Sequence, residues 1–144
     1  MSAIRHLAIC VFRHRTRILV ARGFDDVKNE PFLRPLGGAV EFGEMVVDAL
    51  RREIREELGV EISDPVQLGV LENVFTYRGQ AGHEIVFVFD AKFVDLELYA
   101  KKSLPLNEPI WDGAARWIDL VEPLPAALYP EGLTALLNGG LTNA

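Results

Sequence analysis

The stretch from Gly38 to Val60 constrains the fold of this 144-residue chain more than any other part of it. Glycines stand before its central segment, and Gly59 follows that segment. Between them, apolar side chains recur at the spacing of one face of an α-helix. These are Val47, Leu50, Ile54 and Leu58. We therefore predict a sharp loop, a helix with one packing face, and a left-handed glycine cap at Gly59.

The same helix carries three carboxylates on a different face. Glu53, Glu56 and Glu57 stand at positions i, i+3 and i+4, so their side chains converge on one patch. Like charges at this spacing destabilise a helix by a few tenths of a kcal/mol per pair, roughly, which a bound cation would offset. Carboxylate oxygens suit Mg²⁺ or Mn²⁺, and Mg²⁺ usually shares its coordination with waters and substrate phosphates. The alternative is a solvated surface of ion pairs, but the glycines together with Glu44 and Arg52 favour a metal site.

Residues 38 to 60 resemble the Nudix box, a family signature written G-x5-E-x7-R-E-U-x-E-E-x-G-U, in which U is a bulky aliphatic residue. Every specified position is filled, namely by Gly38, Glu44, Arg52, Glu53, Ile54, Glu56, Glu57, Gly59 and Val60. The order of the predicted elements also resembles Nudix proteins over nearly the whole chain. The resemblance implies an α/β fold, a Nudix-like α/β/α sandwich with a mixed β-sheet. It also implies one Nudix hydrolase domain over residues 1–144.

The resemblance implies a role for each residue of the box. The metal ligands are Glu53, Glu56, Glu57 and the backbone carbonyl of Gly37. The catalytic set comprises Glu57, Glu56, Glu53 and Arg52, with Arg52 acting as scaffold through an ion pair that ties the loop at Glu44 to the helix. The structural support of the box comprises Gly38, Glu44 and Gly59. The general base stays open between Glu57 or Glu56, which we favour, and an acid outside the box.

Five residues outside the box are candidates for substrate binding or proton transfer. Arg34 could bind a substrate phosphate through paired hydrogen bonds or form a surface ion pair. Glu84 lies either at a strand end in water or facing the cleft. Tyr77, like Phe75, could stack a base or pack across strands. The last two, Glu108 and Asp112, fall in a predicted loop, where acids are usually solvated but where function also concentrates.

Composition restricts the class of substrate and the compartment. The net charge is −6, from 15 basic and 21 acidic residues, which argues against a grip on polymeric nucleic acid. The longest apolar runs are too short to cross a bilayer, and the N-terminus lacks a secretory pattern, so we expect a cytoplasmic protein without a membrane partner. The single cysteine, Cys10, lies in an apolar run and is expected in the core.

The remaining elements follow from periodicity and turn residues. We predict a strand pair of residues 4–12 and 17–23, a loop over 24–36, and a hairpin of 67–77 and 83–93 around the turn 78–82. We then predict mostly loop over 95–113, a strand over 115–120, an irregular connection over 123–130 and a helix over 131–138 that stops at the Gly139-Gly140 pair.

The function predicted from the box is a divalent-metal-dependent pyrophosphohydrolase. Its small-molecule substrate would be a nucleoside diphosphate linked to another moiety: a nucleoside triphosphate, a dinucleoside polyphosphate or a nucleotide sugar. The proline typical of ADP-ribose hydrolases is replaced by Thr76, and Tyr77 falls near a tyrosine of dinucleoside polyphosphate hydrolases. The alternatives are a catalytically inactive nucleotide-sensing module on the same fold, and an isomerase, which would need a cysteine in the cleft. Dimers are common in the family, which leaves a homodimer open.

Overall fold

The fold contains two β-sheets and two α-helices in a computed structural model that describes residues 2–107 and 112–142. The first sheet has the strand order β5-β1-β7-β6, with β1 parallel to β7 and antiparallel to β5. Its strands are β1 (Ile4–Cys10), β5 (Leu36–Ala39), β6 (Ile62–Tyr77) and β7 (Gln80–Phe93). This mixed α/β architecture confirms the predicted fold class.

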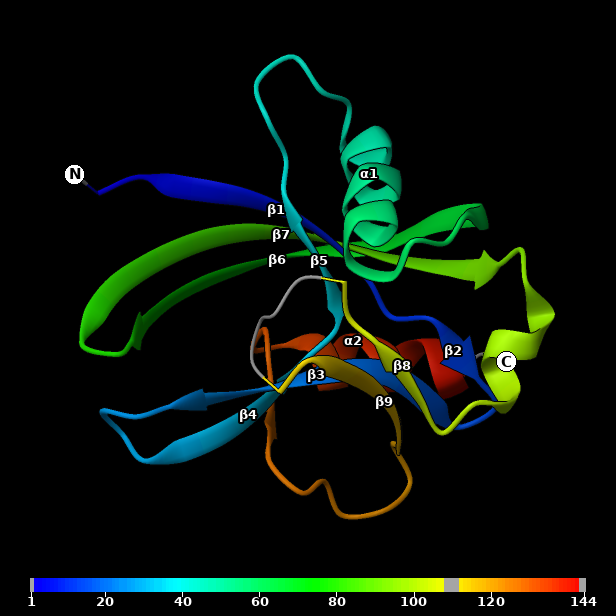
Figure 1. Ribbon diagram of the computed structural model, residues 1–144. Coiled ribbons are helices and arrows are strands. Elements are labelled where there is room, and N and C mark those ends of the chain that lie inside the picture. The colour runs from blue at the N-terminus through cyan, green and yellow to red at the C-terminus, as the bar shows by residue number, and fades with distance from the viewer. Residues whose placement is uncertain (1, 108–111, 143–144) are drawn as a thin grey trace.

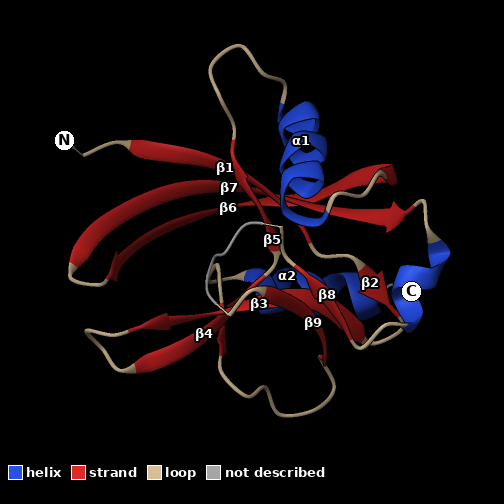
Figure 2. Cartoon of the chain, viewed as in Figure 1, coloured by secondary structure: helices blue, strands red, loops and turns tan. Residues whose placement is uncertain are grey.

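The second sheet has the order β10-β4-β3-β9-β8, and β2 pairs with the first residues of β3. Its strands are β2 (Arg13–His14), β3 (Arg17–Asp25), β4 (Glu30–Arg34), β8 (Ser103–Pro105), β9 (Ala114–Asp119) and β10 (Ala127–Leu128). Figure 1 shows this sheet below the first one, with the C-terminal helix α2 (Leu133–Thr142) between them in the view and α1 (Val46–Leu58) above. The cartoon in Figure 2 distinguishes the long, curved β6–β7 hairpin from the short strands of the second sheet.

Strand β1 separates two hydrophobic cores because its side chains alternate between two buried faces. Ala8 and Cys10 pack in the core that contains the apolar face of α1. Leu7 and Ile9 pack in the core that contains Leu133 of α2. Helices on both faces of this strand explain why its sequence reads as a continuous apolar run rather than as an alternating one.

Helix α1 forms where the sequence predicts it. Leu50 and Ile54 are fully buried, while Val47 and Leu58 pack at the edge of the same core. Gly59 ends the helix with φ 69° and ψ 26°, and its N–H donates to the carbonyl of Arg55 at 2.8 Å. The predicted left-handed cap is therefore confirmed.

Several expected elements are wrong in their partners or their limits. Residues 4–12 and 17–23 do not pair, because β1 pairs with β5 and β7 while β3 pairs with β2, β4 and β9. The expected loop 24–36 contains β4, which pairs with β3 as a hairpin. Strand β6 begins earlier than predicted, at Ile62, and the tight turn at its end is confined to Arg78 and Gly79.

The C-terminal half also departs from the sequence expectation. The segment predicted as loop contains a 3₁₀ helix, η1 (Leu96–Ala100), and strand β8, each held by a buried leucine. Helix α2 continues through Gly139 and Gly140 to Thr142 instead of stopping there. Over the described ranges 2–107 and 112–142, no helix has the length and apolar character needed to cross a membrane.

Candidate functional site

Arg52 ties the loop that precedes α1 to the helix itself. Its Nε and Nη2 donate to the two carboxylate oxygens of Glu44 at 2.7 and 3.0 Å, and Nη2 also donates to the carbonyl of Ala39 at 2.9 Å. This paired geometry holds the pKa of Glu44 below its ordinary value of 4.5 and raises the pKa of Arg52. The contact is the one that the eight-residue spacing implies, and it fixes where the loop meets the helix.

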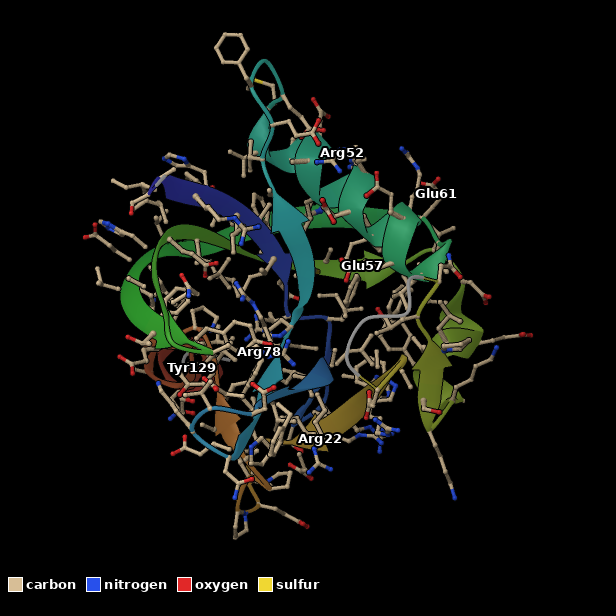
Figure 3. All side chains as sticks on the ribbon, turned by 60° about the vertical axis from the view of Figure 1, so that its left-hand side comes forward. Arg22, Arg52, Glu57, Glu61, Arg78 and Tyr129 are labelled. Carbon is tan, nitrogen blue, oxygen red and sulfur yellow. The ribbon has the colours of Figure 1, made fainter. Side chains whose placement is uncertain are left out.

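The three box carboxylates occupy different environments. Glu57 is buried, with 4% of its surface exposed, and accepts a hydrogen bond from the N–H of Gly37 at 3.0 Å. Glu53 and Glu56 accept instead from Nη1 of Arg52, at 3.0 and 3.3 Å. Within the described part of the chain, no three His, Cys, Asp or Glu side chains are grouped so that they could share a metal ion. Figure 3 shows Arg52 beside the upper loop and Glu57 on the side of α1 that faces the molecule, whereas Glu61 points outward.

The two glycines before the helix bring backbone close to these carboxylates. A Cβ on Gly38 would lie 2.4 Å from the carboxyl carbon of Glu53. A Cβ on Gly37, which has φ 147°, would lie 2.1 Å from the carbonyl oxygen of Ala8 on the neighbouring strand. Only residues without a side chain allow β5 to run between β1 and the carboxylates of α1.

A cavity of about 200 Å³ lies where β5 meets the end of α1. Glu57, Gly37 and Gly38 form one part of its wall. Arg5, Leu7, Ile9, Arg34 and Pro35 line the rest. The buried carboxylate of the box therefore faces an opening large enough for a small anionic group, bordered by two arginines.

A second and larger cavity, of about 390 Å³, lies between the two sheets' hairpin ends. Its wall contains the aromatic rings of Phe32, Phe75, Tyr77 and Tyr129. Phe32 packs edge-to-face against Tyr77 at 5.7 Å and against Tyr129 at 5.8 Å between ring centroids. The buried amide of Asn73 holds the Tyr129 side of the wall by bonding both the N–H and the C=O of Glu131, at 2.8 and 3.2 Å. The cavity thus has an aromatic lining of the kind that receives a planar ring.

Arg5 and Arg34 line both cavities and meet at a buried carboxylate. Arg34 Nη2 donates to Oε1 of Glu84 at 3.0 Å, and Arg5 Nη1 lies 3.6 Å from Oε2. Glu84 is 4% exposed and lies within β7, so the option of a solvated strand end is wrong. The structure brings Arg34, Tyr77 and Glu84 together in the larger cavity, while Phe75 of that wall packs its ring over Gly82.

Asp112, another candidate, does not join the site. Asp112 is exposed, forms an ion pair with Arg116 and lines neither of the two cavities. Glu108 lies outside the described residues. Cys10 is fully buried in the α1 core, and this burial raises the pKa of its thiol, as expected for a core residue. Because Cys10 is the single cysteine and its thiol is buried in this core, the cleft lacks the cysteine that the isomerase alternative requires.

Sequence reasoning missed several residues of the larger cavity, among them Arg5, Phe32, Asn73 and Tyr129. Arg5 lies opposite Glu84 in the parallel pairing of β1 with β7. These two strands are far apart in the sequence, so no local pattern indicates that the two residues meet. Phe32 belongs to a segment predicted as loop, and Tyr129 to one predicted as irregular. No local spacing marks these residues, because each enters the wall from a different strand or loop.

A family model described as the NUDIX domain matches residues 4–135. The chain belongs to the Nudix family. Among curated proteins, the NAD-capped RNA hydrolases NudC of Pseudomonas aeruginosa strains LESB58 and PAO1 are each 34% identical to this Nudix chain over 93 residues. That match covers 63% of this chain but only 29% of the length of each relative.

Solved Nudix structures share the fold. A MutT NUDIX hydrolase from Burkholderia pseudomallei superposes with a TM-score of 0.69 and 26% identity, covering 94% of this chain and 98% of its own. A NUDIX hydrolase from Nitrosomonas europaea gives a TM-score of 0.67 at 16% identity, with 98% and 90% covered, and shows the fold alone. Membership of the Nudix family confirms the predicted enzyme class, a Nudix hydrolase acting on phosphorus-containing acid anhydrides.

Proposed function

We propose that this Nudix chain, acting as a single domain, is a divalent-metal-dependent pyrophosphohydrolase. It would cleave a phosphoanhydride bond in a nucleoside diphosphate linked to another moiety, by attack of water at phosphorus. The observation that carries the proposal is the position of Glu57, a buried box carboxylate that opens on a cavity bordered by Arg5 and Arg34. Such a cavity combines a cation-binding carboxylate with two groups that bind phosphate oxygens.

The chemistry of the donor set fits a hard cation. Glu53, Glu56 and Glu57 supply carboxylate oxygens from one helical turn, and Gly37 presents backbone beside them. Nudix hydrolases generally use divalent metals, and we assign Mg²⁺ or Mn²⁺ to these four residues. Because Arg52 now holds Glu53 and Glu56, binding would require their side chains to turn from Arg52 toward the cavity. When bound, the cation would neutralise phosphate charge and lower the pKa of a bound water.

The residues of the chain supply position and charge for the reaction. Glu44 and Arg52 fix the loop to α1, so that β5 keeps Gly37 and Gly38 against the carboxylates. Arg34 and Arg5 would bind oxygens of the pyrophosphate and so orient the phosphorus for in-line attack by water. Such positioning, with neutralisation of charge, supplies most of the rate acceleration in phosphoryl transfer. No covalent intermediate on the protein is needed.

The general base is best assigned within the box. Glu84 is engaged by two arginines and Asp112 by Arg116, so neither carboxylate is poised to accept a proton. Glu57 and Glu56 remain, and Glu57 is the one that lines the cavity. We therefore assign Glu57 first among the box glutamates as the group that accepts the proton of the attacking water.

The substrate range follows the breadth of the family. Nucleoside triphosphates, dinucleoside polyphosphates and nucleotide sugars all contain the required anhydride. The NudC relatives are named for hydrolysis of NAD-capped RNA, so NAD and a capped RNA join the panel, and exclusion of polymeric nucleic acid stays a prediction. Homodimerisation and a cytoplasmic location also stay predictions.

The test is turnover of that panel in H₂¹⁸O with Mg²⁺ or Mn²⁺, and in excess chelator as the control. We expect cleavage between two phosphates, ¹⁸O in a phosphate product as detected by mass spectrometry, and no cleavage in chelator. Absence of cleavage across the whole panel with either metal would overturn the proposal and favour the nucleotide-sensing alternative. Label in a sugar or nucleobase product would contradict attack at phosphorus.

A further inference from the structure

The cluster of Arg5, Arg34 and Glu84 lies between the two cavities and contains more positive than negative charge. Two guanidinium groups share one carboxylate, which leaves the cluster with one excess positive charge. Arg5 comes from β1, Arg34 from the end of β4, and Glu84 from β7, so elements of both sheets meet here. Arg5 and Arg34 are also the two residues that the walls of both cavities have in common.

The arginines have donors left for a ligand. A guanidinium carries five N–H donors, and Arg34 uses Nη2 on Glu84. In the described part of the chain, its other nitrogens make no hydrogen bond with protein. The Arg34 side chain is 22% exposed, so these donors are accessible but partly shielded from water. Hydrogen bonds from such a group to phosphate oxygens are stronger than bonds formed in open solvent.

Glu84 has the burial and contacts of a residue that positions others. Its carboxylate is almost inaccessible, and its two oxygens are turned toward different arginines. Because its two oxygens face different guanidinium groups, Glu84 holds both arginines at this point. A general base would instead need an oxygen that faces the reacting water rather than a guanidinium group.

We propose that Arg34 and Arg5, held in place by Glu84, bind the diphosphate of a substrate whose nucleobase lies in the aromatic cavity of Phe32, Tyr77 and Tyr129. The diphosphate would then lead from the larger cavity past the arginines to Glu57 in the smaller one. Arg34 and Arg5 are binding residues in this scheme, and Glu84 is a positioning residue. The orientation of the substrate, with its diphosphate toward Glu57, rests on the proposed function. Binding of the nucleotide itself requires neither a metal nor turnover.

The first test is calorimetric titration in excess chelator, where no hydrolysis competes. The probes are ADP, GDP, CDP and UDP with their nucleosides. We expect at least one diphosphate to bind about 30-fold more tightly than its nucleoside, the scale of charge-assisted hydrogen bonds. Arg34→Ala should remove most of this difference while changing nucleoside affinity less than about twofold, and Arg34→Lys should restore part of it. Arg22→Ala, which removes an exposed arginine of β3 outside both cavities, is the matched control and should change neither affinity.

The second test separates a positioning role of Glu84 from a catalytic one. With Mg²⁺ and the best substrate of the panel, Glu84→Gln should raise KM by about tenfold and lower kcat less than about threefold, because the arginines lose their anchor but the base remains. Loss of kcat by roughly a hundredfold or more at unchanged KM is the signature of a general base and would overturn the proposal. Glu72→Gln, an exposed glutamate on β6, is the control and should leave both constants unchanged.

The outcomes of the two proposals can be told apart. If a diphosphate binds in chelator with the expected arginine dependence but no substrate is cleaved, the hydrolase assignment fails while this inference stands. If hydrolysis occurs but Arg34→Ala leaves diphosphate affinity unchanged, this inference is overturned while the hydrolase assignment stands. Should Glu84→Gln not fold, the Arg34→Ala and Arg34→Lys pair still decides the result. No binding by any of the four diphosphates or nucleosides would overturn the inference.

Discussion

The two cavities of this protein are built in opposite ways. Beside the smaller one, the box contacts join residues close in sequence, from the Arg52–Glu44 pair to the bond between Glu57 and Gly37, 20 positions apart, and Arg5, Leu7 and Ile9 of β1 complete its wall. The larger one is closed by contacts between distant segments, such as Arg34 with Glu84, 50 positions apart, and Asn73 with Glu131, 58 positions apart. The groups assigned to chemistry thus lie on one continuous segment, whereas those assigned to recognition come from several.

This difference predicts how catalysis and substrate recognition respond to amino-acid substitution. One segment can keep its internal geometry while the surrounding loops vary, because its ion pairs and cap are local. A wall assembled from β4, β6, β7 and the segment before α2 changes whenever one of those elements shifts. We therefore expect substitutions at the box to affect turnover, and substitutions at the wall to affect affinity and the stability of the hairpin ends.

Glu57→Gln should have the largest effect. Replacing the buried carboxylate with a neutral amide keeps its shape but removes the charge proposed to bind the cation and accept the proton. We expect kcat to fall at least about a hundredfold, as measured by product formation with Mg²⁺. Glu61→Gln, which removes an exposed carboxylate just after the helix, is the control and should retain the parent rate. Full activity of Glu57→Gln would show that the box helix does not supply the catalytic carboxylate.

Asn73→Ala should have the next largest effect, and it acts on the larger cavity. It removes both hydrogen bonds to the Glu131 backbone and leaves a buried N–H and C=O without these partners. We expect the free energy of unfolding in urea to fall by about 1–3 kcal/mol. Because Tyr129 lies just before this anchor, KM should rise as well. An unchanged urea midpoint would mean that the segment before α2 is held by other contacts.

Tyr129→Leu should raise KM by about fivefold with little change in kcat. The substitution keeps an apolar side chain but removes the ring that packs edge-to-face against Phe32. Steady-state kinetics on the preferred nucleotide, with calorimetry on its nucleoside, provides the measurement. If kcat fell instead and nucleoside affinity stayed the same, the division between a chemical cavity and a recognition cavity would be wrong.

The smallest effect is expected from the pH dependence of stability at Asp25, which joins the tips of two hairpins near the larger cavity. Burial alone would raise its pKa, but hydrogen bonds from the N–H groups of Arg78, Lys28 and Val27 outweigh burial and hold the pKa below its ordinary value of 3.8. A lowered folded-state pKa stabilises the protein above pH 3.8, and this contribution is lost as pH falls through the folded-state value.

Thermal unfolding of Asp25→Asn between pH 7 and pH 2 tests this point. The variant should unfold at a lower temperature than the parent at pH 7, and the gap between the two should narrow only below pH 3.8. A gap that stays constant down to pH 2 would show that the Asp25 charge does not hold the hairpin tips together.

The sequence alone predicted the fold class and helix α1, including its buried face and the cap at Gly59, and these are confirmed. It predicted the β6–β7 hairpin, but it failed for the pairing of β1, a central strand whose neighbours lie far away in sequence. It placed Arg34, Tyr77 and Glu84 on a list of candidates without a reason to join them. It placed Asp112 beside them, although that residue lies outside both cavities.

What the sequence determined by itself is helix α1 and its cap at Gly59, because helical periodicity and a glycine cap act over a few residues and leave a readable spacing. Only the tertiary structure decided that Arg5 faces Glu84, that Arg34 reaches the same carboxylate, and that Phe32, Tyr77 and Tyr129 enclose one cavity. The physical reason is that strand register and packing between sheets depend on the burial of the whole chain, which no local pattern of residues records.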